Sequence, residues 1–334
     1  MDLVVMWAAI LAVGVVMYVV LDGFDLGVGI VFPFQKSRDN RDRMMSSIAP
    51  VWDGNETWLV LGGVIILAIF PRAYSAILPA VYLPIFAMLL GFILRGVAFE
   101  FRHRSPGGEH IWRRVFALGS TLAAFSQGVV LGHFIGGFSF EAGVFEGGPW
   151  SWLHPFNLFT GLSLVVGYGM LGSCWLVMKT EGELRAWSRS MALRFSAFVL
   201  VAMSVISLLT PYVDPEIARC WFTWPEMLWL MPVPLLTAVA FIGLWRGLLK
   251  DNSWQPFLCG VVIFLLGFLG LAISLWPYAV PRVMTIWEAA SSPASQQLLI
   301  WGALFSIPAI LGYTGYTYWV FRGPVKDHDG YGQD

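Results

Sequence analysis

Charged residues are scarce in this sequence. Asp, Glu, Lys and Arg make up only 12% of its 334 residues, which is about half of their share in a typical soluble domain. Hydrophobic residues make up 57%, and the mean hydropathy is +0.70. The net charge is −1, and no block of like charge indicates a nucleic-acid partner. We therefore expect a chain that is solvated mostly by lipid.

Several motifs that mark catalytic or metal sites are also missing. The chain has three cysteines and no CxxC pair, so it lacks metal-site spacing. Walker, GxSxG and HExxH sequences are absent. The glycine-rich DGFDLGVG (22–29) has no Lys and lies in an apolar segment, so it is not a phosphate loop. The N-terminal MDLVVMWAAILAVG has no basic region, which favours a retained first membrane span over a removed signal peptide.

Long apolar runs, by contrast, fill most of the chain. A membrane-spanning helix needs roughly 20 mostly apolar residues. The short connections leave no room for a soluble catalytic domain, so we predict one all-α membrane domain over residues 1–334. It contains about nine transmembrane helices, at 4–26, 53–70, 76–98, 115–138, 156–178, 194–213, 226–247, 257–278 and 298–320.

The basic residues predict the orientation of these spans. Lys and Arg are enriched in cytoplasmic loops. With nine spans, 17 of the 20 basic residues fall on one side, and only Arg72, Arg219 and Arg282 fall on the other. The arginine-rich side is therefore predicted to be cytoplasmic. An odd number of spans then places the N-terminus in the periplasm and the C-terminus in the cytoplasm.

Ionisable residues gather at the cytoplasmic ends of the first three predicted spans. Such groups at membrane depth are costly and usually functional. Asp22 and Asp25 are three residues apart, as are Asp53 and Glu56, so each pair shares a helix face. The cluster is completed on the third span by Arg95 and Glu100.

The five carboxylic acids of this cluster are Asp22, Asp25, Asp53, Glu56 and Glu100. Because protonatable groups close together can pass protons on, they predict a proton pathway that opens to the cytoplasm, with Arg95 offsetting part of their charge. A structural role is the alternative for each acid alone, since the helix dipole favours an acid in the first turn of a helix.

His133 lies in the fourth predicted span and suggests a haem ligand. The other four histidines lie in loops or at the ends of spans, whereas several haems would need several well-placed axial ligands. We therefore interpret His133 as a hydrogen-bonded packing residue. No metal site is predicted in this chain.

Four segments at the cytoplasmic and periplasmic ends of these spans resemble one known family. DGFDLGVG (22–29), SIAPVWDGNETWLVLGG (47–63), FPRAYS (70–75) and RGVAFEFR (95–102) are similar to subunit II of the bd-type terminal quinol oxidases. VWDGNETWLVLGG looks closest to the cyanide-insensitive branch. The resemblance covers the first hundred residues well, and the rest of the chain agrees in length and number of spans.

The resemblance implies a heterodimer with a larger subunit I. That partner carries haems b and d, or b only, and oxidises quinol while oxygen is reduced to water. The quinol oxidase needs both chains, so this one is not catalytic alone. Subunit II is expected to stabilise the complex and supply part of the proton route. Some members of the family bind a quinone in this subunit, and the family allows for a small single-helix accessory subunit.

Residue roles follow by motif. Asp25, Asp53 and Arg95 match polar positions associated with proton access and the subunit interface, and Trp52 matches the tryptophan beside the acid. Two other classes of protein remain as alternatives. A proton- or cation-coupled transporter is favoured by the glycine-interrupted, acid-bearing first span. A purely structural subunit would carry no protons.

Overall fold

The computed structural model describes residues 2–102, 108–138, 140–141 and 144–325, so Arg104 and Lys326 of the charge count lie outside it. The described chain is helical apart from two short hairpins, β1 (Phe140–Glu141) with β2 (Val144–Phe145) and β3 (Tyr278–Val280) with β4 (Met284–Thr285). The helices are α1 (Leu3–Val31), the 3-10 turn Phe32–Phe34, α2 (Arg38–Ser46), α3 (Trp52–Ile69), α4 (Pro71–Phe101), α5 (Glu109–Gly136), α6 (Pro155–Lys179), α7 (Gly182–Val213), α8 (Pro215–Phe222), α9 (Glu226–Leu230), α10 (Pro232–Leu249), α11 (Gln255–Leu275), α12 (Ile286–Ala289) and α13 (Pro293–Val320).

The prediction of an all-α integral membrane protein is confirmed. Eight helical segments of the described chain are long and apolar enough to cross a membrane. The second of the nine predicted spans, 53–70, corresponds to helix α3, which is not among these eight. Its first five residues include Asp53, Asn55 and Glu56, which lower the mean hydropathy of an 18-residue helix. A total of nine spans therefore stays a prediction.

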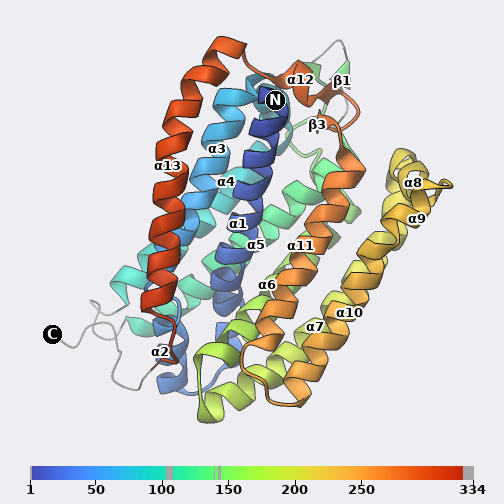
Figure 1. The fold of residues 1–334 in the computed structure, drawn as a ribbon. Helices are drawn as coiled ribbons and strands as arrows, with labels where there is room; N and C mark the ends of the chain where they lie inside the picture. The colour runs from blue at the N-terminus through green and yellow to red at the C-terminus, as the bar shows by residue number, and fades with distance from the viewer. Residues whose placement is uncertain (1, 103–107, 139, 142–143, 326–334) are drawn as a thin grey trace.

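The two ends of the helix bundle carry different connections. The start of α1, both hairpins and the short helices α8, α9 and α12 lie at the upper end in Figure 1. Helix α2 and the last turn of α13 lie at the lower end. The start of α1 and the end of α13 therefore lie at opposite ends of the bundle. Which end faces the cytoplasm stays a prediction.

Helix α1 crosses the centre of the molecule and packs closely on α6. A Cβ atom added at Gly27 would lie 1.9 Å from the backbone oxygen of Tyr168, and one added at Gly172 would lie 2.2 Å from the backbone carbon of Gly27. Only glycine allows the two backbones to approach so closely. The contact holds α1 in one rotation about its axis, and in this rotation Asp22 and Asp25 are completely buried.

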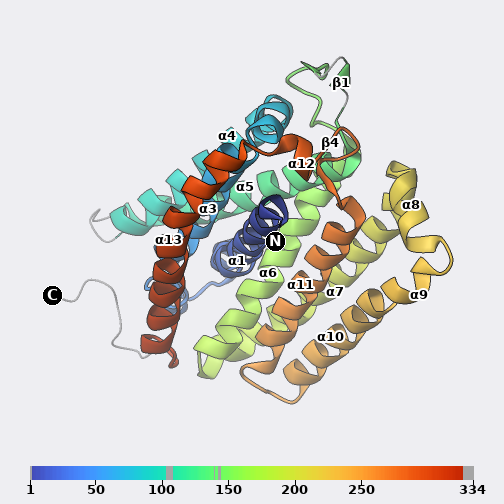
Figure 2. The same ribbon diagram turned by 45° about the horizontal axis from the view of Figure 1, so that its top comes forward.

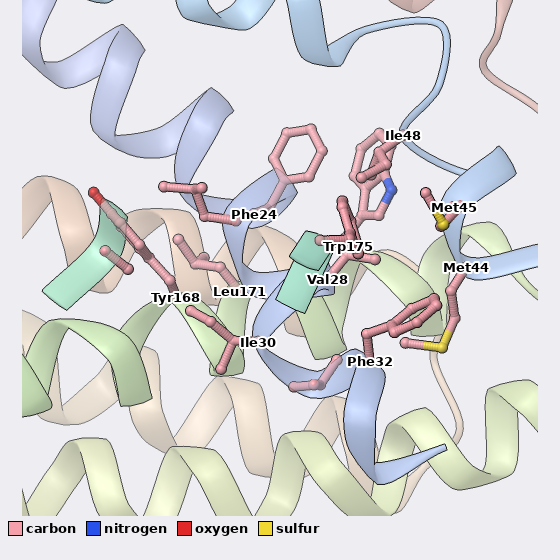
Figure 3. Packing of buried hydrophobic residues seen from close by; sticks show 14 of the residues in the cluster. Phe24, Val28, Ile30, Phe32, Met44, Met45, Ile48, Tyr168, Leu171 and Trp175 are labelled. Atoms are coloured by element: carbon pink, nitrogen blue, oxygen red, sulfur yellow. The ribbon is translucent and has the colours of Figure 1, made fainter. Parts of the chain in front are cut away.

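The other helices form two groups around α6. Helices α1, α3, α4 and α5 surround the main apolar cluster, where Phe24 of α1 stacks on Trp175 of α6 with ring centroids 4.1 Å apart (Figure 3). Helices α7, α10 and α11 pack on the other side of α6 around a second apolar cluster. Helix α13 runs along the outside of the first group, next to α3 (Figure 2).

Candidate functional site

Arg95 is the only cation in the buried part of the predicted cluster, among the residues that the structure describes. It lies on α4 with 1% of its surface exposed. Its Nη2 atom donates a hydrogen bond to Asp22 Oδ1 at 2.8 Å and a second one to Glu56 Oε1. The guanidinium carbon lies 5.8 Å from the ring centroid of Trp52 and 5.4 Å from that of Phe92. One arginine on α4 therefore bonds to acids of α1 and α3, and its guanidinium group also lies against two aromatic rings.

Asp25 is held by a second set of hydrogen bonds, one helical turn from Asp22. The side-chain nitrogen of Asn55 on α3 donates to Asp25 Oδ2 at 2.6 Å and lies 3.3 Å from the backbone oxygen of Leu21. The hydroxyl of Tyr318 on α13 donates to Asn55 Oδ1 at 3.1 Å. The Asp25 side chain therefore accepts its hydrogen bond from α3, and the donor Asn55 is held in turn by bonds to α1 and α13.

The cluster contains more acids than bases. Asp22, Asp25 and Glu56 all interact electrostatically with Arg95, so three carboxyl groups surround one positive charge. Burying unbalanced charge in an apolar medium is expensive. Asp22 Oδ2, Asp25 Oδ1 and two guanidinium nitrogens have no hydrogen-bond partner among the described residues. Buried polar atoms of this kind are normally satisfied by ordered water.

The predicted site residues fall into two sets. Asp22, Asp25, Glu56 and Arg95 come together as described, and the half-buried Trp52 stacks on Phe99 beside them. Asp53 and Glu100, by contrast, are exposed on the surface of this chain. Asp53 lies in the first turn of α3, close enough to act electrostatically on Glu56. Asp53 is therefore at the edge of the buried cluster, and Glu100 lies outside it.

Sequence reasoning missed the uncharged members of this site. Asn55 and Tyr318 were not selected, although Asn55 lies within the same WDGNE segment as two of the acids. Tyr18, four residues before Asp22 on α1, is 7% exposed, and its hydroxyl has no hydrogen-bond partner among the described residues. The helical spacing of Tyr18, Asp22 and Asp25 was the signal that could have found it. Tyr318 is too distant in sequence for any such signal.

His133 lies beside a close contact between α5 and α6, and its Nε2 atom has no hydrogen-bond partner among the described residues. Its Nδ1 atom lies 3.3 Å from the side-chain nitrogen of Asn157, and its ring meets the ring of Phe138 edge-on at 5.0 Å. At the neighbouring Gly132, an added Cβ would lie 2.7 Å from Cα of Asn157, so α5 and α6 are in close contact there. A porphyrin would need these two helices to separate. The structure describes neither His103 nor His328.

Comparison with known proteins identifies the family. The family model for cytochrome bd terminal oxidase subunit II matches residues 3–321. This chain belongs to that family. Cytochrome bd-I ubiquinol oxidase subunit 2 of Escherichia coli (strain K12) is 27% identical over 97% of this chain and 95% of the relative. Cytochrome bd ubiquinol oxidase subunit 2 of Bacillus subtilis (strain 168) is also 27% identical, over 96% of both chains.

A solved structure supports the same fold. A chain of the bd oxidase from Geobacillus thermodenitrificans matches with a TM-score of 0.79 at 17% identity, over 96% of this chain and 99% of that chain. The predicted membership in the bd oxidase subunit II family is thus confirmed, and the chain is a multi-pass protein of the bacterial cytoplasmic (inner) membrane. Its assignment to the cyanide-insensitive branch stays a prediction.

Proposed function

We propose that this chain is the haem-free subunit II of a quinol:oxygen oxidoreductase in the bacterial aerobic respiratory chain. In this proposal it stabilises a haem-bearing subunit I and contributes to proton uptake from the cytoplasm. Its similarity to subunits whose names specify ubiquinol oxidases supports the reaction. Reduction of oxygen to water consumes protons, so an oxidase buried in a membrane needs a path that delivers them.

The observation that carries the proton-uptake role is the buried cluster of Asp22, Asp25, Glu56 and Arg95. A charged side chain at membrane depth is costly, and clusters of this kind usually line ion or proton pathways. Here the carboxyl groups outnumber the cation, and several of their polar atoms are not used in bonds to the described residues. Acids with that arrangement can take up a proton and release it without breaking the packing around them.

The exposed acids suggest where protons enter this cluster. Asp53 lies at the N-terminal turn of α3, and Glu56 follows one turn later with 26% of its side chain exposed. Glu56 and Asp22 bond to the same guanidinium nitrogen. We assign Asp53 as the access point and Asp25 as the deeper relay. Glu100, exposed on the last turn of α4, is a second candidate for access from the same end of the bundle.

The face formed by α3 and α13 is the surface that we assign to subunit I. None of the most apolar stretch of α13 is buried in this chain, and Trp301 and Phe305 are 74% and 79% exposed. Gly62 of α3 and Gly312 of α13 have no atom within 4 Å of an added Cβ, so a neighbouring helix has space to approach them.

The haems belong to subunit I in this proposal. We expect haems b and d, or b only, with their axial ligands supplied by the partner. The haems would supply electron transfer and oxygen reduction. The residues of this chain would hold and move protons and support the partner. Quinol and oxygen are the substrates of the complex, and a bound quinone or a small single-helix accessory subunit is compatible with the family.

The transporter alternative loses its main support. It rested on a first span interrupted by glycines, as in the broken helices of transporters. The structure shows α1 as one continuous helix from Leu3 to Val31. Gly23 and Gly27 serve as contact points for Tyr168 instead of breaking the helix.

The test is Asp25→Asn in the complex with subunit I. Asparagine keeps the size and hydrogen-bonding capacity of the side chain but cannot carry the proton. We expect a several-fold fall in quinol oxidase turnover per haem at normal haem content. Unchanged turnover per haem would rule out the relay. Activity that falls only together with haem content would leave the purely structural subunit as the explanation.

A further inference from the structure

Tyr318 is the point at which the outermost helix reaches the buried acids. Helix α13 is exposed over most of its length, with only Gln296 and Thr317 fully buried. The ring of Tyr318 packs edge-on against Phe24 at 6.4 Å and against Trp175 at 6.2 Å. These contacts place its hydroxyl next to α3. A polar group on a helix that is otherwise exposed in this chain is thereby brought into the protein interior.

The carboxamide of Asn55 connects this hydroxyl to Asp25. Its nitrogen faces two acceptors, Asp25 Oδ2 and the backbone oxygen of Leu21, while its oxygen accepts from Tyr318. Two acceptors on one side and a donor on the other fix the orientation of the amide. Asn55 is 1% exposed, so water does not compete freely for these bonds. The order of donation is therefore Tyr318 to Asn55 to Asp25.

Hydrogen bonds in such a chain strengthen one another. A donor at the amide oxygen polarises the carboxamide and makes its N–H groups better donors. The bond to Asp25 therefore depends on a hydroxyl that lies on a different helix. A shift of α13 would loosen Asn55 first, and the hydrogen bond to Asp25 with it. The contacts of Asp22 and Glu56 with Arg95 do not involve α13.

We propose that Tyr318 is a positioning residue: through the carboxamide of Asn55 it fixes the hydrogen bond that Asp25 accepts, and so makes the relay depend on the seating of α13. This inference rests on the proposed proton-uptake role and on the assignment of α13 to the face that receives subunit I. It predicts that the route is complete only when α13 is held in place. Neither the ring of Tyr318 nor the charge of the cluster has to change for this effect.

The experiment is a double-mutant cycle in the purified oxidase complex. Tyr318→Phe, Asp25→Asn and the double variant are compared by turnover per haem, with Tyr212→Phe as a matched control, because Tyr212 lies on α7 and is 86% exposed. Phenylalanine keeps the ring contacts and removes only the hydroxyl. We expect Tyr318→Phe to lower turnover per haem about threefold, as suits one hydrogen bond of typical net strength. The double variant should match Asp25→Asn alone, because Tyr318 acts through Asp25.

Three results would overturn the inference. The first is a double variant whose loss is the product of the two single losses, which would show independent roles. The second is full turnover in Tyr318→Phe while Asp25→Asn is impaired. The third is loss of haem-bearing complex in Tyr318→Phe, which would show a role in assembly.

A spectroscopic measurement separates this inference from the proposed function. The infrared bands of the Asp25 carboxyl group are assigned as those lost in Asp25→Asn. They should shift in Tyr318→Phe and stay in place in Tyr212→Phe. If Asp25→Asn leaves turnover unchanged, proton uptake through Asp25 is wrong, whatever the bands do. If the bands fail to shift in Tyr318→Phe, the positioning inference is wrong, whatever Asp25→Asn does to turnover.

Discussion

The two helix groups on either side of α6 differ in the residues that they bury: one buries apolar side chains, and the other also buries ionisable ones. Where α7, α10 and α11 meet α6, the buried residues are apolar ones such as Met170, Phe241 and Leu244. Inside this apolar cluster the bond of Trp245 to Ser196 Oγ at 2.8 Å is uncharged. The ion pair of Arg185 with Asp251 involves an exposed residue in the connection after α10. On the other side, α1, α3 and α4 bury Asp22, Asp25 and Arg95.

This contrast separates what the fold needs from what the function needs. The apolar group shows that helices of this chain can pack without a buried ionic residue. A buried ion pair is therefore weak evidence for stability, since apolar residues of similar volume often do as well or better. The acids of the first group must be explained by something other than packing. Proton uptake supplies that explanation and also predicts which substitutions separate activity from assembly.

The largest effect is expected from Arg95→Met. Removing the guanidinium leaves Asp22 and Glu56 without their shared cation, and breaking a buried pair in this way typically costs about 3–5 kcal/mol. We expect little or no assembled, haem-bearing complex in purified membranes. Adding Asp22→Asn to Arg95→Met should recover part of the yield, because it removes one of the stranded charges. Normal yield of Arg95→Met would mean that the charges are not coupled.

A second prediction compares the two ends of the molecule. Gly148 lies in the connection before α6, and Glu183 in the first turn of α7, and both are exposed. In a Cys220→Ser background, Gly148→Cys should react with a membrane-impermeant thiol reagent in intact cells. Glu183→Cys should react only after the cells are permeabilised. The reversed pattern would contradict the predicted orientation and, with it, proton access from the cytoplasm.

A smaller effect is expected from Asp53→Asn. Asp53 is exposed on α3, so the substitution should leave haem content and assembly normal. As the access point it should lower turnover per haem, but less than Asp25→Asn does, because water can partly replace it. Lower pH or a small permeant acid should restore part of the rate. A loss of turnover that neither treatment relieves would contradict the access role and favour a contact with subunit I.

Much of this arrangement could be predicted because lipid imposes simple rules on sequence. Long apolar runs gave the fold class, and the pairing of acids three residues apart placed Asp22 and Asp25 on one buried face. Membership in the family followed from the segments around these acids. The number of spans could not be settled in the same way, because α3 combines an apolar body with a polar first turn.

The link between Asn55 and Tyr318 could not be predicted, for a physical reason. Tyr318 is 263 residues from Asn55, and nothing local in the sequence shows that their helices touch. Asn55 itself carries no charge, so a search for ionisable residues passes over it. Asp53 and Glu100 illustrate the opposite error, since both are acids at the right end of a helix and both point out of the buried cluster. Helical position alone does not determine which side of a helix is covered.

The smallest effect is expected from Ser196→Ala in the apolar group. Ser196 is completely buried and accepts a hydrogen bond from Trp245, so the substitution leaves the indole nitrogen without this partner. Hydrogen bonds between helices in membranes contribute about 0.6 kcal/mol on average. We therefore expect a slight loss of thermal stability of the detergent-purified complex and unchanged turnover per haem. A fall in turnover per haem as large as that of Asp25→Asn would remove the distinction between the two helix groups, because any buried polar bond would then affect activity.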